Sequence, residues 1–332
     1  MMRAGSGGAD AALRLGVVGA GIMGSNHARV LAGLAGVKLV GIADPDPAQR
    51  ELVNRVLGCA TVTDLDALTS LGVDAVTIAA PTHLHHDIAL TCIDRGIHVL
   101  VEKPIASTVE EGREIMSAAR RKGMTLMVGH VERFNPAVQA IKAAIKGEDI
   151  LSIGITRVGP FPPRMSNVGV VIDLAVHDID LIRWFTDSDI VEVQPQLSSA
   201  VAEREDIALL QFRTASGVLA HINTNWLTPF KARNVTVATR GKYVTGDLLT
   251  RQVTECFGFQ PDGSYSMRHL SVGHEEPLRA ELIAFCNAIR AGEPPAVTGE
   301  EGVASLEVAI QCLDGRPLDI QTPRRAPQRA AG

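Results

Sequence analysis

A histidine with carboxylates on both sides occurs just past the middle of the chain, in the run DLAVHDID at residues 173–180. On a helix, Asp173, His177 and Asp180 are spaced i, i+4 and i+7, so their side chains share one face. Carboxylates beside an imidazole set its tautomer and stabilise its protonated form. A base that takes the proton of a hydroxyl group needs these properties. The alternative is a solvated acidic helix face that carries one histidine.

A lysine follows directly after a short apolar run. Residues 98–101 read HVLV, a pattern typical of a buried strand, and Glu102, Lys103 and Pro104 come next. Ligands of open α/β sheets bind at the carboxyl edge of the strands, which is where Lys103 would emerge. A residue before proline is restricted to extended conformations, and this limits where Lys103 points. Taken alone, the motif fits a functional lysine and a surface lysine equally well.

A glycine-rich turn near the start of the chain comprises Gly19, Ala20, Gly21, Ile22, Met23 and Gly24. It has the GxGxxG spacing, and it stands after an apolar strand pattern and before a helical one. Such glycines allow a tight turn and bring backbone N–H groups, at the positive end of a helix, against a pyrophosphate. The turn therefore predicts a dinucleotide site. A turn that only packs a helix on a sheet is the alternative.

An aspartate stands at the distance beyond this turn that a dinucleotide site requires. Asp44 is 20 residues after Gly24, at the end of the second strand pattern. A carboxylate in this position accepts hydrogen bonds from both ribose hydroxyls and repels a 2′-phosphate, which favours NAD over NADP. The run DPDP, which Asp44 begins, is also a good turn at the start of a helix.

Residues 1–129 are predicted to form an α/β Rossmann domain that binds NAD. Short runs that are apolar throughout alternate here with helical segments, which is typical of a doubly wound parallel sheet covered on both faces. The expected strands are residues 13–19, 37–43, 75–79, 98–101 and 125–128.

Residues 130–332 are predicted to form a C-terminal α+β domain for substrate binding and oligomerisation. A helix is expected over residues 170–185, followed by strand patterns joined by tight turns. One hairpin should pair residues 234–239 with 242–247 across Arg240 and Gly241. These hairpins indicate an open, mostly antiparallel sheet.

The composition excludes several classes of protein. The chain has 332 residues, 46% of them hydrophobic, and a formal charge of −5, without the Lys/Arg-rich block that nucleic-acid binding needs. No apolar run is long enough for a transmembrane helix. The cysteines are odd in number and form no CxxC pair, which disfavours disulfides and zinc and fits the cytoplasm. They are Cys59, Cys92, Cys256, Cys286 and Cys312.

Three histidines in the run PTHLHHD are the one arrangement that suggests a metal. Only His83 and His86, or His83 and Asp87, share a helical face, and no third ligand is apparent. We therefore expect no metal. His85 is expected near the nicotinamide half of the cofactor site.

Four segments together resemble the Gfo/Idh/MocA oxidoreductases over essentially the whole chain. They are GAGIMGSNHARVL at residues 19–31, AAPTHLHHDIAL at 79–90, EKPIA at 102–106 and the DxxxH run at 173–177. The resemblance implies an NAD-dependent sugar dehydrogenase in which Lys103, His177 and Asp173 handle the substrate hydroxyl. It also implies further cofactor contacts, from Ala80, Pro81, His85, Glu102, Lys103 and His130. His130 departs from the family, where an asparagine or similar residue often follows the sixth strand.

A finer resemblance, to family members that oxidise the C3 hydroxyl of UDP-N-acetylglucosamine, is carried by GHVERFNPA (129–137), RVGPFPPR (157–164), VIDLAVHDIDLIRW (171–184) and NWLTPFKAR (225–233). It implies a 3-keto sugar nucleotide, which a separate transaminase would aminate for a lipid A diamino sugar. A diphosphate substrate needs cations, and loop residues near the expected site supply them. They are Arg133, Arg157, Arg164, Lys231 and Arg233.

Two other functions remain open on this sequence. One is an inositol-type or other simple sugar dehydrogenase of the same family. The other is a non-catalytic NAD-binding sensor, because fold does not dictate function. Such a sensor would be free to lose Lys103 and His177, and both are present. Family resemblance also implies a homodimer or homotetramer that buries the open sheet.

Overall fold

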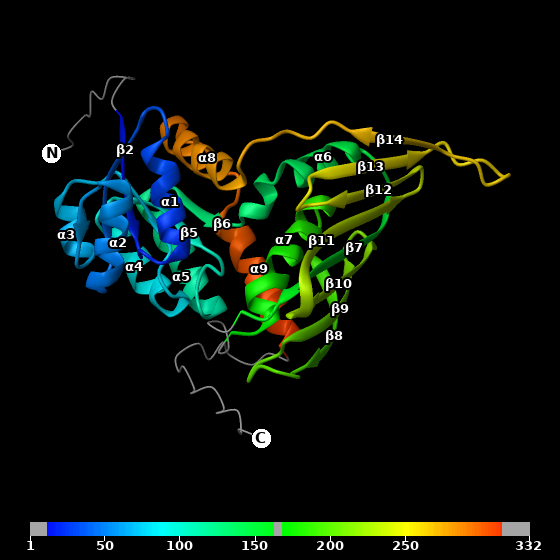
Figure 1. The fold of residues 1–332 in the computed structure, drawn as a ribbon, viewed down its shortest axis with the longest axis horizontal. Coiled ribbons are helices and arrows are strands. Elements are labelled where there is room, and N and C mark those ends of the chain that lie inside the picture. The colour runs from blue at the N-terminus through cyan, green and yellow to red at the C-terminus, as the bar shows by residue number, and fades with distance from the viewer. Residues whose placement is uncertain (1–11, 163–167, 314–332) are drawn as a thin grey trace. The chain divides into compact units, whose positions relative to one another are not determined.

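The computed structural model describes residues 12–162 and 168–313, which form two compact units. Of the described residues, unit 1 comprises 12–106, 110–129 and 278–300, and unit 2 comprises 107–109, 130–162, 168–277 and 301–313. Figure 1 shows the elements of both units. Among the described residues, no helix combines the length and the apolar character that crossing a bilayer requires.

Unit 1 contains a sheet of six parallel strands in the order β3-β2-β1-β4-β5-β6. The strands are β1 (Leu13–Val18), β2 (Val37–Ala43), β3 (Thr61–Val62), β4 (Ala75–Ile78), β5 (His98–Glu102) and β6 (Leu126–Gly129). Every residue of β4 is buried, as expected for a strand covered on both faces. The predicted doubly wound parallel sheet is confirmed. Only β3 was missed, because two residues are too few to show an apolar pattern.

Local sequence signals explain where the helices of unit 1 begin and end. Asp46 and Asp64 cap two of them by accepting the N–H of Ala48 and of Ala67, each at 2.8 Å. Gly58 ends one helix in the left-handed conformation that glycine tolerates best. The helices are α1 (Ile22–Ala32), α2 (Pro47–Leu57), α3 (Leu65–Ser70), α4 (His85–Asp94), α5 (Val109–Lys122) and α8 (Pro277–Ala291), with a short 3₁₀ turn, η1 (Thr82–Leu84).

The chain returns to unit 1 near its C-terminus, and this differs from the predicted division at residue 129. Apart from Pro277, helix α8 belongs to unit 1. The N–H of Val128 in β6 donates to the carbonyl of Val297 at 3.2 Å, and Arg290 donates to the carbonyl of Gly36 at 2.6 Å. A single cut between the two predicted domains is therefore wrong for residues 278–300.

Unit 2 is built on a sheet of eight strands in the order β14-β13-β12-β11-β7-β10-β9-β8 (Figure 1). Only the β7–β10 pair is parallel, so the predicted mostly antiparallel sheet is confirmed. The predicted hairpin has the expected register, with Asn234 opposite Asp247 and Ala238 opposite Tyr243. The strands are β7 (Ile150–Pro160), β8 (Ile190–Ser198), β9 (Ile207–Thr214), β10 (Leu219–Asn225), β11 (Leu227–Thr239), β12 (Lys242–Asp247), β13 (Gln252–Phe257) and β14 (Ser266–Leu270).

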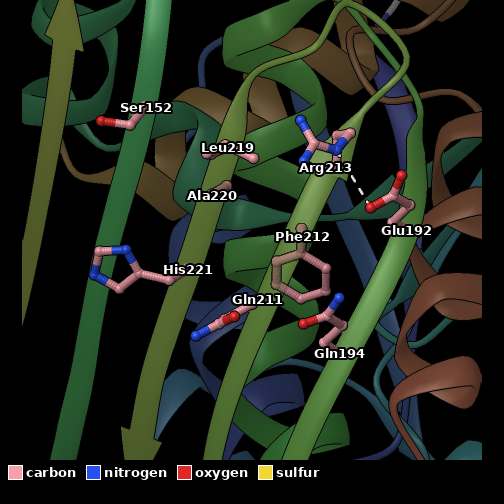
Figure 2. A pocket seen from close by; sticks show the side chains of 9 residues that line it. All are labelled: Ser152, Glu192, Gln194, Gln211, Phe212, Arg213, Leu219, Ala220 and His221. Carbon is pink, nitrogen blue, oxygen red and sulfur yellow. Dashed lines mark hydrogen bonds and ion pairs between the residues drawn. The ribbon is translucent and has the colours of Figure 1, made fainter.

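The two faces of this sheet differ in character. Helices α6 (Pro136–Ala144) and α7 (Val176–Thr186) pack on one face. The chain ends its described part with α9 (Gly299–Cys312). The other face, which we call the outer face, carries the alternate residues of each strand, such as the exposed positions of β9. Figure 2 looks onto a hollow on the outer face, lined by polar side chains that include Gln194, Gln211 and His221.

The predicted histidine helix is not a uniform α-helix. Residues Val171–Ala175 form a π turn, labelled η4, and α7 follows it directly from Val176 to Thr186. A π turn adds a residue to one turn, so the side chains before and after it no longer follow α-helical spacing. The spacing expected between Asp173 and His177 is therefore altered. Turns of this kind occur frequently at functional sites.

Candidate active site

The glycine turn of unit 1 has a shape that fits a dinucleotide. Gly19 has a φ of +96°, and a Cβ on it would lie 2.6 Å from the carbonyl oxygen of Ala79. A Cβ on Gly24 would lie 1.8 Å from the carbonyl oxygen of Gly19, so α1 packs against the turn too closely for any side chain. A Cβ on Gly21 would meet nothing within 4 Å. Open space at this helix N-terminus leaves the backbone accessible to a pyrophosphate.

Asp44 joins the end of β2 to the glycine turn. Its carboxylate accepts the N–H of Ala20 at 2.7 Å and the N–H of Asp46 at 2.8 Å. The second bond belongs to the turn that starts α2, so the structural reading of the DPDP run also applies. Asp44 is half-buried beside the turn, which is where the ribose of a dinucleotide lies in this kind of fold.

His85 lies between the loops that follow β4 and β5. It is 1% exposed, and its two ring nitrogens are each 2.9 Å from a carbonyl oxygen, those of Pro104 and Ala80. Burial lowers the pKa of its imidazole, which favours the neutral form. A neutral imidazole has one N–H, so His85 donates to one of these two carbonyls, and its contact with a cofactor stays a prediction.

Lys103 is the first residue beyond β5, at the carboxyl edge of the sheet. It is half-buried, and its peptide bond to Pro104 is cis. Its backbone N–H donates to the Oε2 of Glu102 at 3.3 Å, and the Oε1 of Glu102 lies 2.9 Å from the Nε2 of His27. The lysine backbone is therefore tied to a carboxylate that is itself held from α1.

His177 occupies the first turn of α7 in unit 2 and is half-buried, as is Asp173 in the π turn before it. The ring of His130 meets the His177 ring edge-on, with centroids 6.1 Å apart. His130 is 1% exposed, and its Nδ1 lies 3.9 Å from the Oδ2 of Asp180. The structure therefore places His130 beside the candidate base, and its contact with a cofactor stays a prediction.

Asp180 is held by a buried arginine. Its two oxygens accept bonds from the Nε and Nη2 of Arg133, both at 2.7 Å. Burial raises the pKa of Asp180, but the charges of His130 and Arg133 outweigh it and leave the pKa below its usual range. Arg133 is 3% exposed and also pairs with Glu301. The guanidinium of Arg133 is therefore engaged by carboxylates, and its contact with a substrate diphosphate stays a prediction.

Arg157 is buried in a second group of charges. It is 3% exposed and donates to Asp178 at 2.7 Å and to Glu132 at 2.8 Å. Burial opposes its charge, but the two carboxylates outweigh this and hold its pKa above the usual range. Arg233 shares Glu132 at 2.9 Å. Arg157 is thus engaged by carboxylates as Arg133 is, and its contact with a substrate also stays a prediction.

Three other predicted cations are also untested as substrate ligands. Lys231 is exposed on β11, and Arg233 is partly exposed. Arg164 lies outside the described residues. These three positions are therefore neither corrected nor confirmed as ligands of a diphosphate.

Sequence reasoning missed two buried side chains in unit 1. His27 on α1 and Glu281 on α8 are both 0% exposed. Each of them, together with Glu102, contributes one ring nitrogen or carboxylate oxygen, and these three atoms lie within 4.8 Å of one another. The available signal was a polar residue inside an apolar helical stripe, since Glu281 is spaced with Leu278 and Phe285, both buried.

Comparisons with known proteins agree with this architecture. The family model described as "Oxidoreductase family, NAD-binding Rossmann fold" matches residues 13–130. The model described as "GFO/IDH/MocA C-terminal domain" matches residues 158–244. The two matches fall in the parallel sheet of unit 1 and in the large sheet of unit 2.

Individual relatives extend the similarity along the chain. UDP-N-acetylglucosamine 3-dehydrogenase of Acidithiobacillus ferrooxidans is 29% identical over 303 residues, covering 90% of this chain and 96% of that protein. Its solved structure has a TM-score of 0.85 at 28% identity and covers 93% of this chain and 99% of that one. Inositol 2-dehydrogenase 1 of Saccharopolyspora erythraea is 30% identical over 330 residues, covering 93% of this chain and 96% of that protein.

A solved structure with the inositol name is also similar. The putative myo-inositol dehydrogenase from Sinorhizobium meliloti has a TM-score of 0.76 at 27% identity and covers 92% of this chain and 98% of that one. The solved structures of the UDP-N-acetylglucosamine 3-dehydrogenase and of the putative myo-inositol dehydrogenase therefore share this fold. On the strength of both family models and of a relative 30% identical across nearly its whole length, the chain is an NAD-dependent oxidoreductase that belongs to the Gfo/Idh/MocA family.

Proposed function

We propose that the protein oxidises the C3 hydroxyl of UDP-N-acetylglucosamine to the 3-keto sugar nucleotide, with NAD as the hydride acceptor. The observation that carries this proposal is the similarity in structure to the Acidithiobacillus ferrooxidans enzyme, whose TM-score exceeds that of the myo-inositol dehydrogenase from Sinorhizobium meliloti. Sequence identity does not separate the two substrate classes, because it is nearly the same for both.

The proposed chemistry assigns three residues to one hydroxyl group. Lys103 donates a hydrogen bond to the hydroxyl oxygen and stabilises its developing negative charge. His177 takes the hydroxyl proton, and Asp173 supports the imidazolium that forms. The hydrogen on the carbinol carbon leaves as a hydride, and bound NAD supplies the acceptor for it.

The proposed cofactor site is the carboxyl edge of the unit 1 sheet. The glycine turn would hold the pyrophosphate, and Asp44 would bind the adenosine ribose. The loops beyond β4 and β5, with Ala80, Pro81, Glu102 and Lys103, would line the nicotinamide end. The open space at Gly21 supports this assignment.

Substrate identity is tested by NADH formation with a panel of UDP-sugars, free sugars and cyclitols. We expect turnover of UDP-N-acetylglucosamine, and we expect Lys103→Met to lower kcat by about 10²–10³-fold because one charge-stabilising donor is lost. Lys38→Met, which removes an exposed lysine of the same unit, should leave kcat unchanged.

Two outcomes of this panel would contradict the proposal. Turnover of a cyclitol but not of UDP-N-acetylglucosamine would select an inositol-type dehydrogenase. Binding of NADH without turnover of any compound would select a non-catalytic sensor.

We also propose the pathway and the compartment to which this reaction belongs. A 3-keto sugar nucleotide is the substrate that an aminating enzyme requires, so a pyridoxal phosphate transaminase is expected downstream, on a route to a lipid A diamino sugar. The cysteines are all free, which fits a reducing cytoplasm.

A homodimer or homotetramer that covers the outer face of the unit 2 sheet is the proposed assembly. Leu209 and Leu219 are 49% and 50% exposed on this face. Sedimentation equilibrium should show a dimer or tetramer, and Leu209→Arg with Leu219→Asp should shift it toward monomer, since charge disfavours burial. Leu52→Asp is the matched control, because Leu52 is 46% exposed on α2 of unit 1. A monomeric parent protein would exclude the assembly.

A further inference from the structure

Three ionisable side chains meet in the interior of unit 1, and the reaction proposed above does not use two of them. His27 comes from α1, Glu102 from the end of β5 and Glu281 from α8. They are 0%, 7% and 0% exposed, and one ring nitrogen or carboxylate oxygen from each lies within 4.8 Å of those of the other two. We call this group the buried triad.

The partners within the buried triad are distributed unequally. Glu102 has two, since its Oε1 lies 2.9 Å from the Nε2 of His27 and its Oε2 accepts the N–H of Lys103 at 3.3 Å. Glu281 has none, because neither of its carboxyl oxygens finds a hydrogen-bond partner among residues 12–162 and 168–313. A buried carboxylate without a partner is strongly disfavoured.

Two carboxyl groups this close in a buried site do not both ionise. The negative charge belongs on Glu102, where His27 and the Lys103 amide stabilise it. Although burial raises the pKa of Glu102, the hydrogen bond and charge of His27 together with the charge and amide of Lys103 outweigh this and leave the pKa lowered. Burial and then the charge of Glu102 raise the pKa of Glu281 well above its usual range. The geometry and these directions place the proton on Glu281.

The space around Glu102 is adapted to its carboxylate. Gly129, the last residue of β6, pairs with Glu102, and a Cβ there would lie 3.2 Å from the carboxyl carbon and from Oε2. Any larger residue would press on the group that holds the Lys103 amide. The orientation of Lys103 thus depends on the Glu102 carboxylate, for which Gly129 leaves space and to which His27 and the Lys103 amide are bonded.

Resting on the proposed role of Lys103, we propose that the buried triad is a positioning unit for this lysine, in which Glu281 is the neutral, protonated member and Glu102 carries the charge. His27 from α1 and Glu102 from β5 are the titratable groups that face Glu281. Neutral Glu281 keeps a second negative charge away from Glu102, so that Glu102 stays on the Lys103 backbone. His27 and Glu281 are positioning residues and touch no reacting atom.

The proton on Glu281 is tested by thermal unfolding of the full chain with Glu281→Gln. The raised pKa means that the folded state binds more protons than the unfolded state, so wild-type stability falls as pH rises above the unfolded pKa. Glutamine does not titrate. The Tm of Glu281→Gln relative to wild type should therefore increase from pH 4.5 to pH 8, by about 3 °C or more. Equal slopes would overturn the proposal.

Matched variants make this readout specific. Glu293→Gln makes the same change at an exposed position just beyond the end of α8. It should reproduce the wild-type dependence of Tm on pH. A metal in the buried triad is the other occupant that two carboxylates and an imidazole suit. One tightly held divalent ion per purified chain, lost in His27→Ala, would overturn the proposal.

The effect on Lys103 needs a comparison of two substitutions at Glu281. Glu281→Leu removes the polar group, and it should lower kcat by about 10-fold or more while the Kd for NADH stays within about 3-fold, because a misplaced reacting group slows turnover more than it weakens binding. Glu281→Gln should restore kcat. Loss of kcat and NADH binding together, or no rescue by glutamine, would indicate a structural role only and overturn the proposal.

A substrate-free measurement separates this proposal from the proposed function. The Lys103 amide donates to Glu102, so its ¹H–¹⁵N cross-peak should move in Glu281→Leu and return in Glu281→Gln. If no sugar is oxidised, the proposed function fails. The cross-peak and the pH dependence of Tm then still test whether the buried triad positions Lys103. An unmoved cross-peak would overturn the positioning role whatever the substrate.

Discussion

Replacing His177 with glutamine is expected to lower kcat by about 10²–10⁴-fold, the range for loss of a group that transfers a proton. Glutamine keeps a polar side chain but has no nitrogen that takes a proton near neutral pH. Because His177 lies on α7 of unit 2, the glycine turn of unit 1 should be unaffected. The Kd for NADH should therefore stay close to the wild-type value. Stopped-flow NADH formation with the best substrate of the panel measures the first effect, and NADH fluorescence the second.

His221→Gln is the matched control for this variant. His221 is exposed on the outer face of the unit 2 sheet (Figure 2), so the same substitution there should leave kcat within about 3-fold. A His177→Gln protein with nearly normal kcat would remove the proposed base. Asp173, in the π turn, should then be tested as an independent proton acceptor with the variant Asp173→Asn.

Arg157→Met should destabilise the protein by about 3–5 kcal/mol, because it leaves Asp178 buried without its cation. Asp178 is 0% exposed, and its carboxylate accepts bonds from the Nε and Nη2 of Arg157. Glu132 would keep Arg233 as a partner. Urea unfolding followed by tryptophan fluorescence gives the free energy of unfolding.

A double-mutant cycle tests whether the loss comes from this pair. Arg157→Met with Asp178→Leu replaces both charges by apolar groups and should recover most of the stability that Arg157→Met loses. The KM for the nucleotide sugar should change little. A raised KM with unchanged stability would instead support the predicted contact of Arg157 with the substrate.

The fold was predictable from local patterns because each pattern had one stable solution. Apolar runs such as residues 75–78 are buried on both faces, and only a parallel sheet covered by helices provides this. The hairpin of β11 and β12 was visible from the turn at Arg240 and Gly241. Strand β8 was missed because its inner positions are mostly half-buried, which leaves little apolar alternation.

The candidate site was predictable in its residues but not in their partners. The sequence shows that Asp178 and Asp180 neighbour His177, and they do so along the chain. It does not show that Arg157 and Arg133 lie on the other side of them, because those contacts span 21 and 47 positions. A loop arginine fits a cation for substrate on the sequence alone, and only the structure shows that its guanidinium has a carboxylate partner inside unit 2.

The π turn and the buried triad were beyond sequence reasoning for different reasons. No residue in VIDLA breaks an α-helical pattern, so an inserted residue leaves no local signal. Glu281 does leave one, as a carboxyl group in an apolar stripe. Its meaning depends on Glu102, which lies far away in the chain, and pairing across such a distance needs coordinates.

The return of residues 278–300 to unit 1 has a consequence for how the protein is made. A nascent chain that has left the ribosome as far as Gly129 holds all six parallel strands but not α8. It also lacks Val297, whose carbonyl receives the N–H of Val128. Unit 1 is therefore begun before unit 2 but can be completed only after residues 130–277 of unit 2 have been made.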